Sequence, residues 1–316
     1  MKLKQLVFYI ACLTALVAMP GYAQDVLPEC PKPDKHSSPV YPSHEMKQLM
    51  QFVSVDSPMP AVFRNTTENE LTDPAGSLHP FWEKLGALDR PLRIVHIGDS
   101  HVRGHVFPYV MRCSLEDDFG SKAVENIPVT YQTSGIARET GSSGVVYHIL
   151  GVNGATCQSF STPEHIRQIA DLHPDLVILS FGTNEAHGRR YNASEHTAAM
   201  NYLIAELKAS CPDVAFLMTT PPGAYVRNGR RGKIINPRTP LVVENELKFA
   251  REHGIAIWDM YDIVGGKQRA CLNWNAANMY QRDKIHFTHE GYTLQGLLLH
   301  EAFIKAYNHY VATRLD

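Results

Sequence analysis

Short apolar runs rich in β-branched residues alternate along this chain with segments of helical periodicity. Each run spans four to six residues and stops abruptly at glycine, serine, threonine or aspartate. Runs of this kind are typical of buried parallel strands, and strands that alternate with helices form crossover units around a parallel sheet. We therefore predict a three-layer α/β/α sandwich with a central, mostly parallel five-stranded sheet, whose strands cover 92–97, 145–150, 176–179, 214–218 and 255–258. The predicted helices cover 79–88, 107–119, 163–172, 193–209, 241–253 and 291–310.

The first 23 residues have the composition of a secretory signal peptide. Lys2 and Lys4 give a basic start, a short apolar stretch follows, and the small residues Gly21 and Ala23 stand three and one positions before a cleavage point. The apolar stretch is too short to span a bilayer comfortably. We expect residues 1–23 to be removed and the mature protein to be exported, to the periplasm or outside the cell, without stable insertion in a membrane.

Composition divides the rest of the chain into an extension and one folded domain. Residues 24–78 are rich in proline and polar residues, and they form an irregular N-terminal extension with room for a short helix at 45–53. Residues 79–316 carry the alternating pattern and form the domain. The 44% hydrophobic and 20% charged residues are ordinary for a globular protein. A net charge of −2 gives no overall field for a polyanion, so we expect no nucleic-acid partner.

An odd number of cysteines, five, remains after the predicted signal peptide. In an oxidising compartment one or two disulfides can form, and at least one thiol stays unpaired. The chain has no pair of cysteines separated by two residues, so neither a zinc knuckle nor a redox motif is indicated. The pairing stays open among Cys30, Cys113, Cys157, Cys211 and Cys271.

Three predicted strands end at small and polar residues that could do chemistry together. The first leads into Gly98-Asp99-Ser100, and a serine just beyond a strand lies where ligands bind in open α/β sheets. The next two lead to Gly154 and Asn184. A serine that attacks an ester generates an oxyanion, which backbone N–H groups and an asparagine amide stabilise. Each residue alone also fits a plain turn or helix cap, but the set predicts an active site with Ser100 as the nucleophile.

A histidine base for Ser100 is available just ahead of the last predicted helix. The spacing of Asp283 and His286 puts a carboxylate and an imidazole side by side on one helical turn. The carboxylate would orient the ring while the other ring nitrogen takes the serine proton. We prefer His286 among the 16 histidines because its partner is local and because Phe287 could anchor the segment in the core. We expect Asp99, beside the serine, to hold the turn and not to orient the base.

These segments, in this order, resemble the four sequence blocks of the SGNH (GDSL-type) hydrolases, and the likeness extends from about residue 92 to residue 310. The segments 97–101, 151–155, 182–186 and 286–292 further resemble the exported branch that includes peptidoglycan O-acetylesterases. The resemblance implies a flavodoxin-like fold and a serine hydrolase of esters that needs no cofactor and no metal. It also implies roles for individual residues: Ser100, His286 and Asp283 form the triad, and the Ser100 backbone, Gly154 and Asn184 form the oxyanion hole.

Two groups of residues could shape a substrate rim. His101 follows the nucleophile where the broader family usually has leucine, and we expect it at the edge of the active site. With His105 it could instead share a helix face as a pair of metal ligands, but no third ligand is evident. The second group is basic, and it either makes the rim positive toward an anionic glycan or is a solvated surface. It comprises Arg189, Arg190, Arg227, Arg230 and Arg231.

The main functional prediction is an exported serine esterase that removes small acyl groups, above all O-acetyl, from peptidoglycan or another glycan through an acyl-enzyme. A lipase or lysophospholipase is the alternative of the same class, although the chain shows no long apolar lid. A glycan-binding protein with a vestigial site is the alternative from another class. The complete set of five site residues argues against it.

Overall fold

The computed structural model describes residues 58–127 and 135–314, which form one six-stranded sheet with helices around it and a separate two-stranded hairpin. The sheet order is β1-β8-β5-β4-β2-β3; the last five of these strands are parallel, and β1 pairs antiparallel with β8 at one edge. The five predicted strands are confirmed, and β1 is a sixth that is too short to show a pattern. The strands are β1 (Leu71–Thr72), β2 (Pro91–Gly98), β3 (Gly144–Gly151), β4 (Leu176–Ser180), β5 (Ala215–Thr219) and β8 (Ala256–Trp258).

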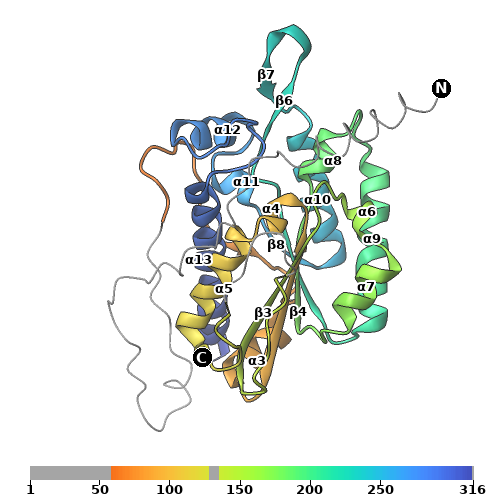
Figure 1. Cartoon of the computed structure of the whole chain (residues 1–316), viewed down its shortest axis with the longest axis vertical. Coiled ribbons are helices and arrows are strands. Elements are labelled where there is room, and N and C mark those ends of the chain that lie inside the picture. The colour runs from red at the N-terminus through yellow and green to blue at the C-terminus, as the bar shows by residue number, and fades with distance from the viewer. Residues whose placement is uncertain (1–57, 128–134, 315–316) are drawn as a thin grey trace, which may run out of the picture.

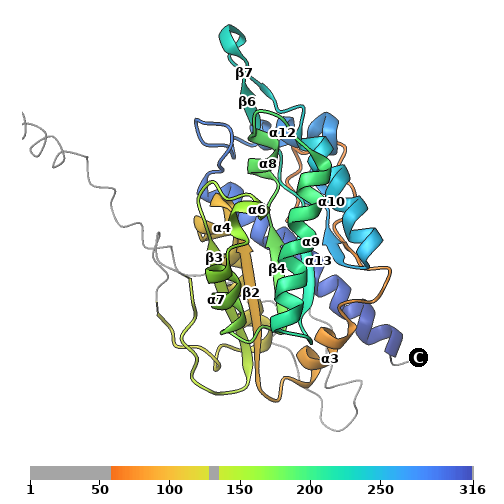
Figure 2. The same cartoon turned by 90° about the vertical axis from the view of Figure 1, so that its right-hand side faces the viewer.

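Helices cover both faces of the sheet (Figure 1). On one face α5 lies against the long C-terminal helix α13 (Figure 1), and α3 lies near the C-terminal end of α13. On the other face lie α7, α9 and α10 (Figure 2). None of the helices in the described ranges is long and apolar enough to cross a membrane. The six predicted helices are confirmed with ends shifted by at most four residues: α3 (His79–Ala87), α5 (Val106–Phe119), α7 (Pro163–Ala170), α9 (Ala193–Ser210), α10 (Thr239–His253) and α13 (His289–Arg314).

Shorter helices that the sequence pattern did not predict follow the strands. Four of them have only four or five residues, which is too short to show a helical period. Three of these start within three residues of the carboxyl end of a strand. The additional helices are α4 (Ser100–Arg103), α6 (Cys157–Phe160), α8 (Thr183–His187), α11 (Met260–Ile263) and α12 (Gly266–Ala276).

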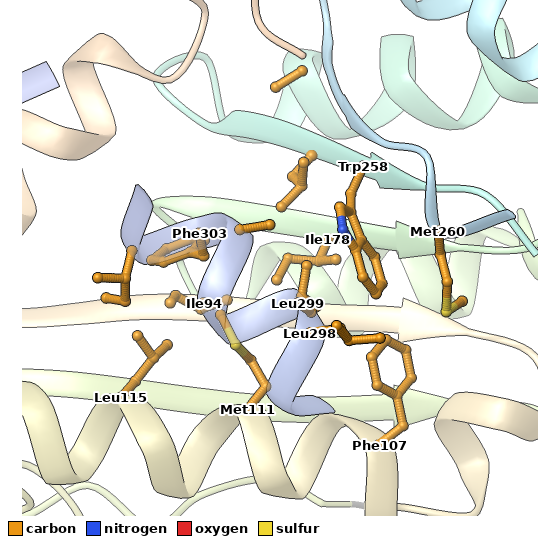
Figure 3. Close-up of a cluster of buried hydrophobic side chains, with 14 of the residues drawn as sticks. Ile94, Phe107, Met111, Leu115, Ile178, Trp258, Met260, Leu298, Leu299 and Phe303 are labelled. Carbon is orange, nitrogen blue, oxygen red and sulfur yellow. The ribbon is translucent and has the colours of Figure 1, made fainter. Parts of the chain in front are cut away.

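Two apolar cores lie on opposite faces of the sheet. Along β2, Ile94 faces one core whereas Val95 and Ile97 face the other, because successive side chains of a strand alternate between faces. Figure 3 shows the first core, where side chains of α5 and α13 pack together over the sheet. Burial of one large apolar side chain contributes about 1.5–3 kcal/mol, so this core fixes both helices on the sheet. Its members include Phe107, Met111, Leu115, Ile178, Trp258, Leu298, Leu299 and Phe303.

Residues 58–78 of the predicted extension pack against the domain. They are irregular apart from β1, yet Phe63 is buried in the first core. The buried Asn69 accepts a hydrogen bond from Trp258 Nε1 at 2.9 Å. The core therefore extends upstream of residue 79, where the sequence pattern places the start of the domain. Two predicted segments lie outside the described residues, the signal peptide at 1–23 and the helix at 45–53.

One of the four cysteines in the described ranges is disulfide-bonded. Cys113 forms a disulfide, while Cys157, Cys211 and Cys271 are free thiols, so the partner of Cys113 lies outside the described residues. Cys30 also lies outside them. The prediction of at least one unpaired thiol is confirmed.

Candidate active site

Three neighbouring strands end side by side at the carboxyl edge of the sheet. Gly98 at the end of β2 pairs with Gly151 of β3 and with Ser180 of β4. The short helices α4, α6 and α8 begin within a few residues of these strand ends. The register therefore brings together the three loops that carry the predicted residues Ser100, Gly154 and Asn184.

Asp99 holds the turn that presents Ser100, as predicted. It is the N-cap of α4, and its Oδ1 accepts a hydrogen bond from the N–H of His101 at 2.8 Å. Its own N–H donates to the Ser180 carbonyl at 3.3 Å, which ties β2 to β4. A Cβ on Gly98 would lie 2.4 Å from that carbonyl oxygen, so only glycine allows this close approach. Ser100 is consequently the first residue of α4, with its side chain half-buried.

Ser100, His286 and Asp283 form a continuous hydrogen-bonded chain. His286 Nε2 lies 3.0 Å from Ser100 Oγ, and His286 Nδ1 lies 2.6 Å from Asp283 Oδ2. When Nδ1–H donates to the carboxylate, Nε2 is the ring nitrogen that can accept the serine proton. The structure thus brings together three residues that the sequence predicts to act as one unit.

The segment with Asp283 and His286 is a tight turn, not the helical turn predicted from their spacing. Asp283 Oδ1 accepts hydrogen bonds from the N–H groups of Ile285 and His286, both at 2.9 Å. Lys284 has a φ of 60°, in the left-handed region that a right-handed helix does not use. When an aspartate side chain accepts hydrogen bonds from the N–H groups of the residues that follow it, these bonds compete with helix formation. The predicted contact is therefore present, but the predicted helical geometry was wrong.

The electrostatics of the turn keep Asp283 ionised. Partial burial raises its pKa, but hydrogen bonds from the His286 side chain and from the N–H groups of Ile285 and His286 outweigh this, so the pKa lies below its ordinary value. The Asp283 side chain is 42% exposed and the His286 side chain 35%. An ionised and hydrated carboxylate at this position stabilises a positive charge on the imidazole.

Phe287 anchors the turn in the core, as predicted. Its ring is buried, stacks on Tyr280 with 4.6 Å between centroids, and meets Trp274 edge-on at 4.9 Å. The N–H of Gln281 donates to the His286 carbonyl at 2.8 Å. His286 therefore has a fixed backbone although its ring reaches solvent.

Gly154 and Asn184 lie on the segments that follow β3 and β4. Gly154 is exposed and has a φ of 73°, which glycine adopts without strain. Asn184, in the first turn of α8, donates from Nδ2 to the Ala155 carbonyl at 2.9 Å and to Asp99 Oδ2 at 3.2 Å. The amide thus ties together the loops that follow β2, β3 and β4, and the longer of its two bonds is the one to Asp99.

His101 lies beneath the site and not at its edge. Its side chain is buried, with Nδ1 2.9 Å from Tyr292 Oη and its ring centroid 5.5 Å from that of His286. Burial lowers the pKa of His101 to about 3, and the neighbouring His286 and His187 contribute to the shift, so the ring is neutral at physiological pH. The prediction that His101 belongs to the substrate rim was wrong, because α4 turns this side chain inward against α13.

His105 does not share a helix face with His101. Helix α4 ends at Arg103, and His105, with a φ of 67°, is the residue before α5. Its side chain is buried as well. Across the described ranges, no group of three or more His, Cys, Asp or Glu side chains is arranged to hold a metal ion.

The basic residues of the predicted rim stand on two segments beyond the carboxyl ends of the strands. Arg189 and Arg190 are exposed just after α8, and Arg227 and Arg230 are exposed on a hairpin of β6 (Tyr225–Arg227) and β7 (Lys233–Ile235). The hairpin projects from this end of the molecule (Figure 1). The sequence predicted only a loop here, because three-residue strands show no periodicity. The Arg231 side chain lies outside what the structure describes.

The base of the hairpin is hydrogen-bonded to both sides of the site. The N–H of Tyr225 donates to the Lys284 carbonyl at 2.9 Å, and the Lys233 ammonium donates to the Arg282 carbonyl. On the other side, His187 Nε2 lies 3.2 Å from the Tyr225 carbonyl oxygen. The base of the hairpin therefore contacts both the Asp283–His286 turn and α8.

Two residues at the site received no role from the sequence. Glu185 accepts hydrogen bonds from backbone N–H groups on two loops, and Tyr292 contacts His101. A glutamate at the third position of α8, where helices often carry a capping carboxylate, was a usable signal for Glu185. No local signal points to Tyr292, because 191 positions separate it from its partner.

The family model of the GDSL-like lipase/acylhydrolase family matches residues 97–294, well over half of the chain. The chain belongs to this family. The matched range contains the whole hydrogen-bonded set around Ser100, so the protein is an ester hydrolase of the GDSL type. No curated protein matches the sequence.

Solved structures share the fold of this GDSL-family chain at low identity. A peptidoglycan O-acetylesterase superimposes with a TM-score of 0.63 at 18% identity, over 75% of this chain and 99% of that one. A lipase/acylhydrolase from Enterococcus faecalis gives a TM-score of 0.45 at 19% identity, over 68% and 96%. An acetyl xylan esterase gives 0.48 at 15% identity, over 66% and 98%. The first of these likenesses supports the α/β fold with a mostly parallel sheet.

Proposed function

We propose that this protein is an exported serine esterase that removes small acyl groups, above all O-acetyl, from an anionic carbohydrate. Ser100 is the nucleophile, His286 the general base, and Asp283 the residue that orients the base. The observation that carries the proposal is the chain of 3.0 Å and 2.6 Å contacts that joins these three side chains beyond the carboxyl end of β2.

The triad divides the reaction into two halves. Ser100 Oγ attacks the ester carbonyl while His286 Nε2 takes its proton, and Asp283 stabilises the imidazolium that forms. The imidazolium then protonates the leaving alcohol oxygen, which leaves an acyl group on the serine. In the second half His286 activates a water molecule, which releases the carboxylic acid and restores the serine.

Three donors serve the oxyanion of each tetrahedral intermediate. Ser100 is the first residue of α4, so its N–H has no partner within the helix. The Gly154 N–H and the Asn184 amide complete the set. The 3.2 Å bond from Asn184 to Asp99 is the longer of its two, and it is the one that an oxyanion replaces. Removal of one such donor costs about 10²- to 10³-fold in rate.

The openness of the site supports a small acyl group on a bulky alcohol. His286 and Asp283 are 35% and 42% exposed, so a polymer can approach them from solvent. A long acyl chain gains about 0.8 kcal/mol per methylene only where apolar side chains cover it. The exposed segments next to the site are basic, which favours a polar substrate over a lipid.

Local charge supports an anionic glycan. The segments 186–194 and 221–243 together contain seven Lys and Arg residues and no Asp or Glu, although the whole chain has a net charge of −2. Guanidinium groups on an exposed rim attract carboxylates and raise the local concentration of an anionic polymer. Peptidoglycan fits this chemistry, and this chain shares its fold with a peptidoglycan O-acetylesterase.

Two features support export. The first 23 residues have the pattern of a signal peptide. Cys113 is disulfide-bonded, and structural disulfides persist in oxidising compartments such as the periplasm.

Release of acetate from a panel of polymers tests the proposal. The panel contains O-acetylated peptidoglycan, acetylated xylan and O-acetylated sialic acid, together with simple esters from acetyl to dodecanoyl. We expect the fastest release from an anionic acetylated glycan, and no release by Ser100→Ala protein. Faster hydrolysis of the dodecanoyl ester would instead identify a lipase. Binding of a glycan without hydrolysis of any ester would identify a vestigial site.

A further inference from the structure

The side chain of Glu185 joins the two loops that carry the proposed oxyanion donors. Its Oε1 accepts a hydrogen bond from the N–H of Cys157 at 2.7 Å, and its Oε2 accepts one from the N–H of Gly182 at 2.9 Å. Cys157 follows Gly154 by three residues, on the loop after β3. Gly182 precedes Asn184 by two residues, on the loop after β4. One carboxylate therefore bridges the two loops.

A local capping role accounts for only half of this arrangement. The bond to Gly182 is the ordinary contact of a glutamate in the first turn of a helix, here α8. The bond to Cys157 crosses 28 positions of sequence and reaches a different loop. The same two loops are joined a second time by the 2.9 Å bond from Asn184 Nδ2 to the Ala155 carbonyl. The loops are thus linked by two independent contacts, one from each of two consecutive side chains.

The surroundings of Glu185 make its position rigid. Its side chain is only 7% exposed, and both carboxylate oxygens have N–H partners. Behind it lies a buried imidazole, with His196 Nε2 3.8 Å from Glu185 Oε1 and 3.9 Å from Glu246 Oε1. Burial raises the pKa of Glu185 above its ordinary value, although hydrogen bonds from the N–H groups of Cys157 and Gly182 oppose this shift. A packed side chain with both oxygens bonded holds its partners at fixed distances.

We propose that Glu185 is a positioning residue of the oxyanion hole, and that its carboxylate sets the distance between the Gly154 N–H and the Asn184 amide. This inference rests on the proposed function, which assigns those two groups as donors. Oxyanion donors act only when they are held about 2.7–3.1 Å from the developing charge. The Glu185 carboxylate, which links the two loops, therefore affects stabilisation of the transition state more than it affects binding of the substrate.

The first test replaces Glu185 by its isosteric amide. Glu185→Gln keeps one oxygen that can accept a hydrogen bond, but it turns an NH₂ group toward the other N–H donor. We expect kcat for p-nitrophenyl acetate to fall about 10- to 100-fold, with KM within about twofold, because the donors lose their spacing. Inhibition by methylboronic acid, which forms a tetrahedral adduct on the serine, weakens by a similar factor. Glu206→Gln, on the exposed face of α9, is the matched control and leaves both values unchanged.

The second test removes one N–H group that donates to Glu185, and it leaves Glu185 itself in place. Cys157 is the first residue of α6, a position where helices accept proline because its N–H is not needed there. Cys157→Pro deletes the N–H that Glu185 binds, whereas Cys157→Ala keeps it and removes only the thiol. We expect the proline variant to lose about tenfold in kcat relative to the alanine variant, with melting temperatures that are similar for the two.

A double-mutant cycle separates positioning from general destabilisation. In an Asn184→Ala background one of the two spaced donors is gone, so Glu185→Gln should cost at least about threefold less in kcat than it does in the wild type. Unchanged kcat in both Glu185→Gln and Cys157→Pro proteins would overturn the inference, as would full additivity with Asn184→Ala. If Ser100→Ala protein kept its activity, the proposed nucleophile itself would be wrong, which is a separate outcome.

Discussion

The turn with Asp283 and His286 and the floor beneath the nucleophile are built in opposite ways. In the turn both side chains are substantially exposed, and the carboxylate has a lowered pKa. The floor consists of Asp99, His101 and Glu185, which all have buried side chains. Burial raises the pKa of Asp99 to about 8 and lowers that of His101 to about 3. The turn therefore favours charged groups, and the floor disfavours them.

This difference separates two tasks within one site. In the proposed reaction His286 gains and loses a proton in every cycle, and nearby water and Asp283 limit the free-energy cost of that charge. In the floor, His101 stays neutral at physiological pH, and the buried side chains hold backbone groups and ring planes in place. Burial suits that task because a buried, fully bonded polar group has few alternative positions. Proton transfer thus belongs to the turn, and positioning belongs to the floor.

The largest effect should come from the nucleophile that both regions serve. Ser100→Ala should lower the rate of acetyl-ester hydrolysis by at least about 10⁴-fold, because the residual rate then depends on the oxyanion donors and binding alone. The side chain is half-buried, so the melting temperature should change little. Stopped assays for acetate, with melting curves, measure both quantities. Wild-type activity in this variant would refute the assignment of both regions.

Removal of the charge from the turn should have the next largest effect. Asp283→Asn keeps an oxygen that can bond to the two N–H groups ahead of it, so the turn stays folded. The amide NH₂, however, faces His286 Nδ1 and stabilises the wrong tautomer. We expect kcat to fall about 10³- to 10⁴-fold with little change in melting temperature. Full activity would show that another residue orients His286.

Within the floor, His101 should affect acid stability and not the rate. His101 stays neutral when folded, with a pKa of about 3, whereas the unfolded chain takes up a proton near its ordinary value of about 6.5. Its contribution to stability is therefore present above about pH 6.5 and is lost as the pH falls toward 3. Each such histidine makes the free energy of unfolding fall by about 1.4 kcal/mol per pH unit in that window.

His101→Gln tests this contribution to acid stability. The number of protons taken up on unfolding should fall by about one between pH 4 and 6. This reduces the slope of the unfolding free energy against pH, which urea titrations at several pH values measure. His309→Gln, at an exposed position near the end of α13, is the control. An unchanged slope in the His101 variant would show that this part of the floor does not resist protonation.

The smallest effect should come from the exposed arginine side chains of the rim. Arg227→Gln with Arg230→Gln should raise KM for an anionic acetylated glycan about three- to tenfold and leave KM for a neutral acetyl ester unchanged, because exposed charges act mainly through long-range attraction. The difference should disappear at about 0.5 M salt. Arg167→Gln with Arg251→Gln, on exposed positions of α7 and α10, is the charge-matched control. An equal rise of KM on both substrates would exclude charge recognition.

The parts of this molecule that depend on a local residue pattern can be predicted from the sequence. Val95 and Ile97 mark a buried strand before Gly98, and that strand leads directly to Ser100. The anchoring role of Phe287 can also be predicted locally, because a large apolar residue in an otherwise polar segment is expected to pack in the core. These elements are confirmed because burial along a strand and the packing of an aromatic ring leave a signal in neighbouring residues.

The rest depends on contacts between distant segments. His101 reads as a polar residue beside the nucleophile, and only the position of Tyr292 on α13 shows that it is buried. The bond from Glu185 to Cys157 likewise requires the register of β3 and β4 around β2. The turn at Asp283 was mistaken for a helix because side-chain bonds to the backbone compete with the helical pattern that its spacing suggests.

The two-residue strand β1 has a consequence for how the chain can be shortened. It covers the outer edge of β8 by antiparallel pairing with Ile257 and Trp258. An uncovered strand edge is a template for pairing with other chains and promotes aggregation. A protein cut to begin at residue 79 would expose that edge and leave Trp258 Nε1 without Asn69. Shortened proteins intended for crystallisation should therefore keep the segment from residue 58 onward.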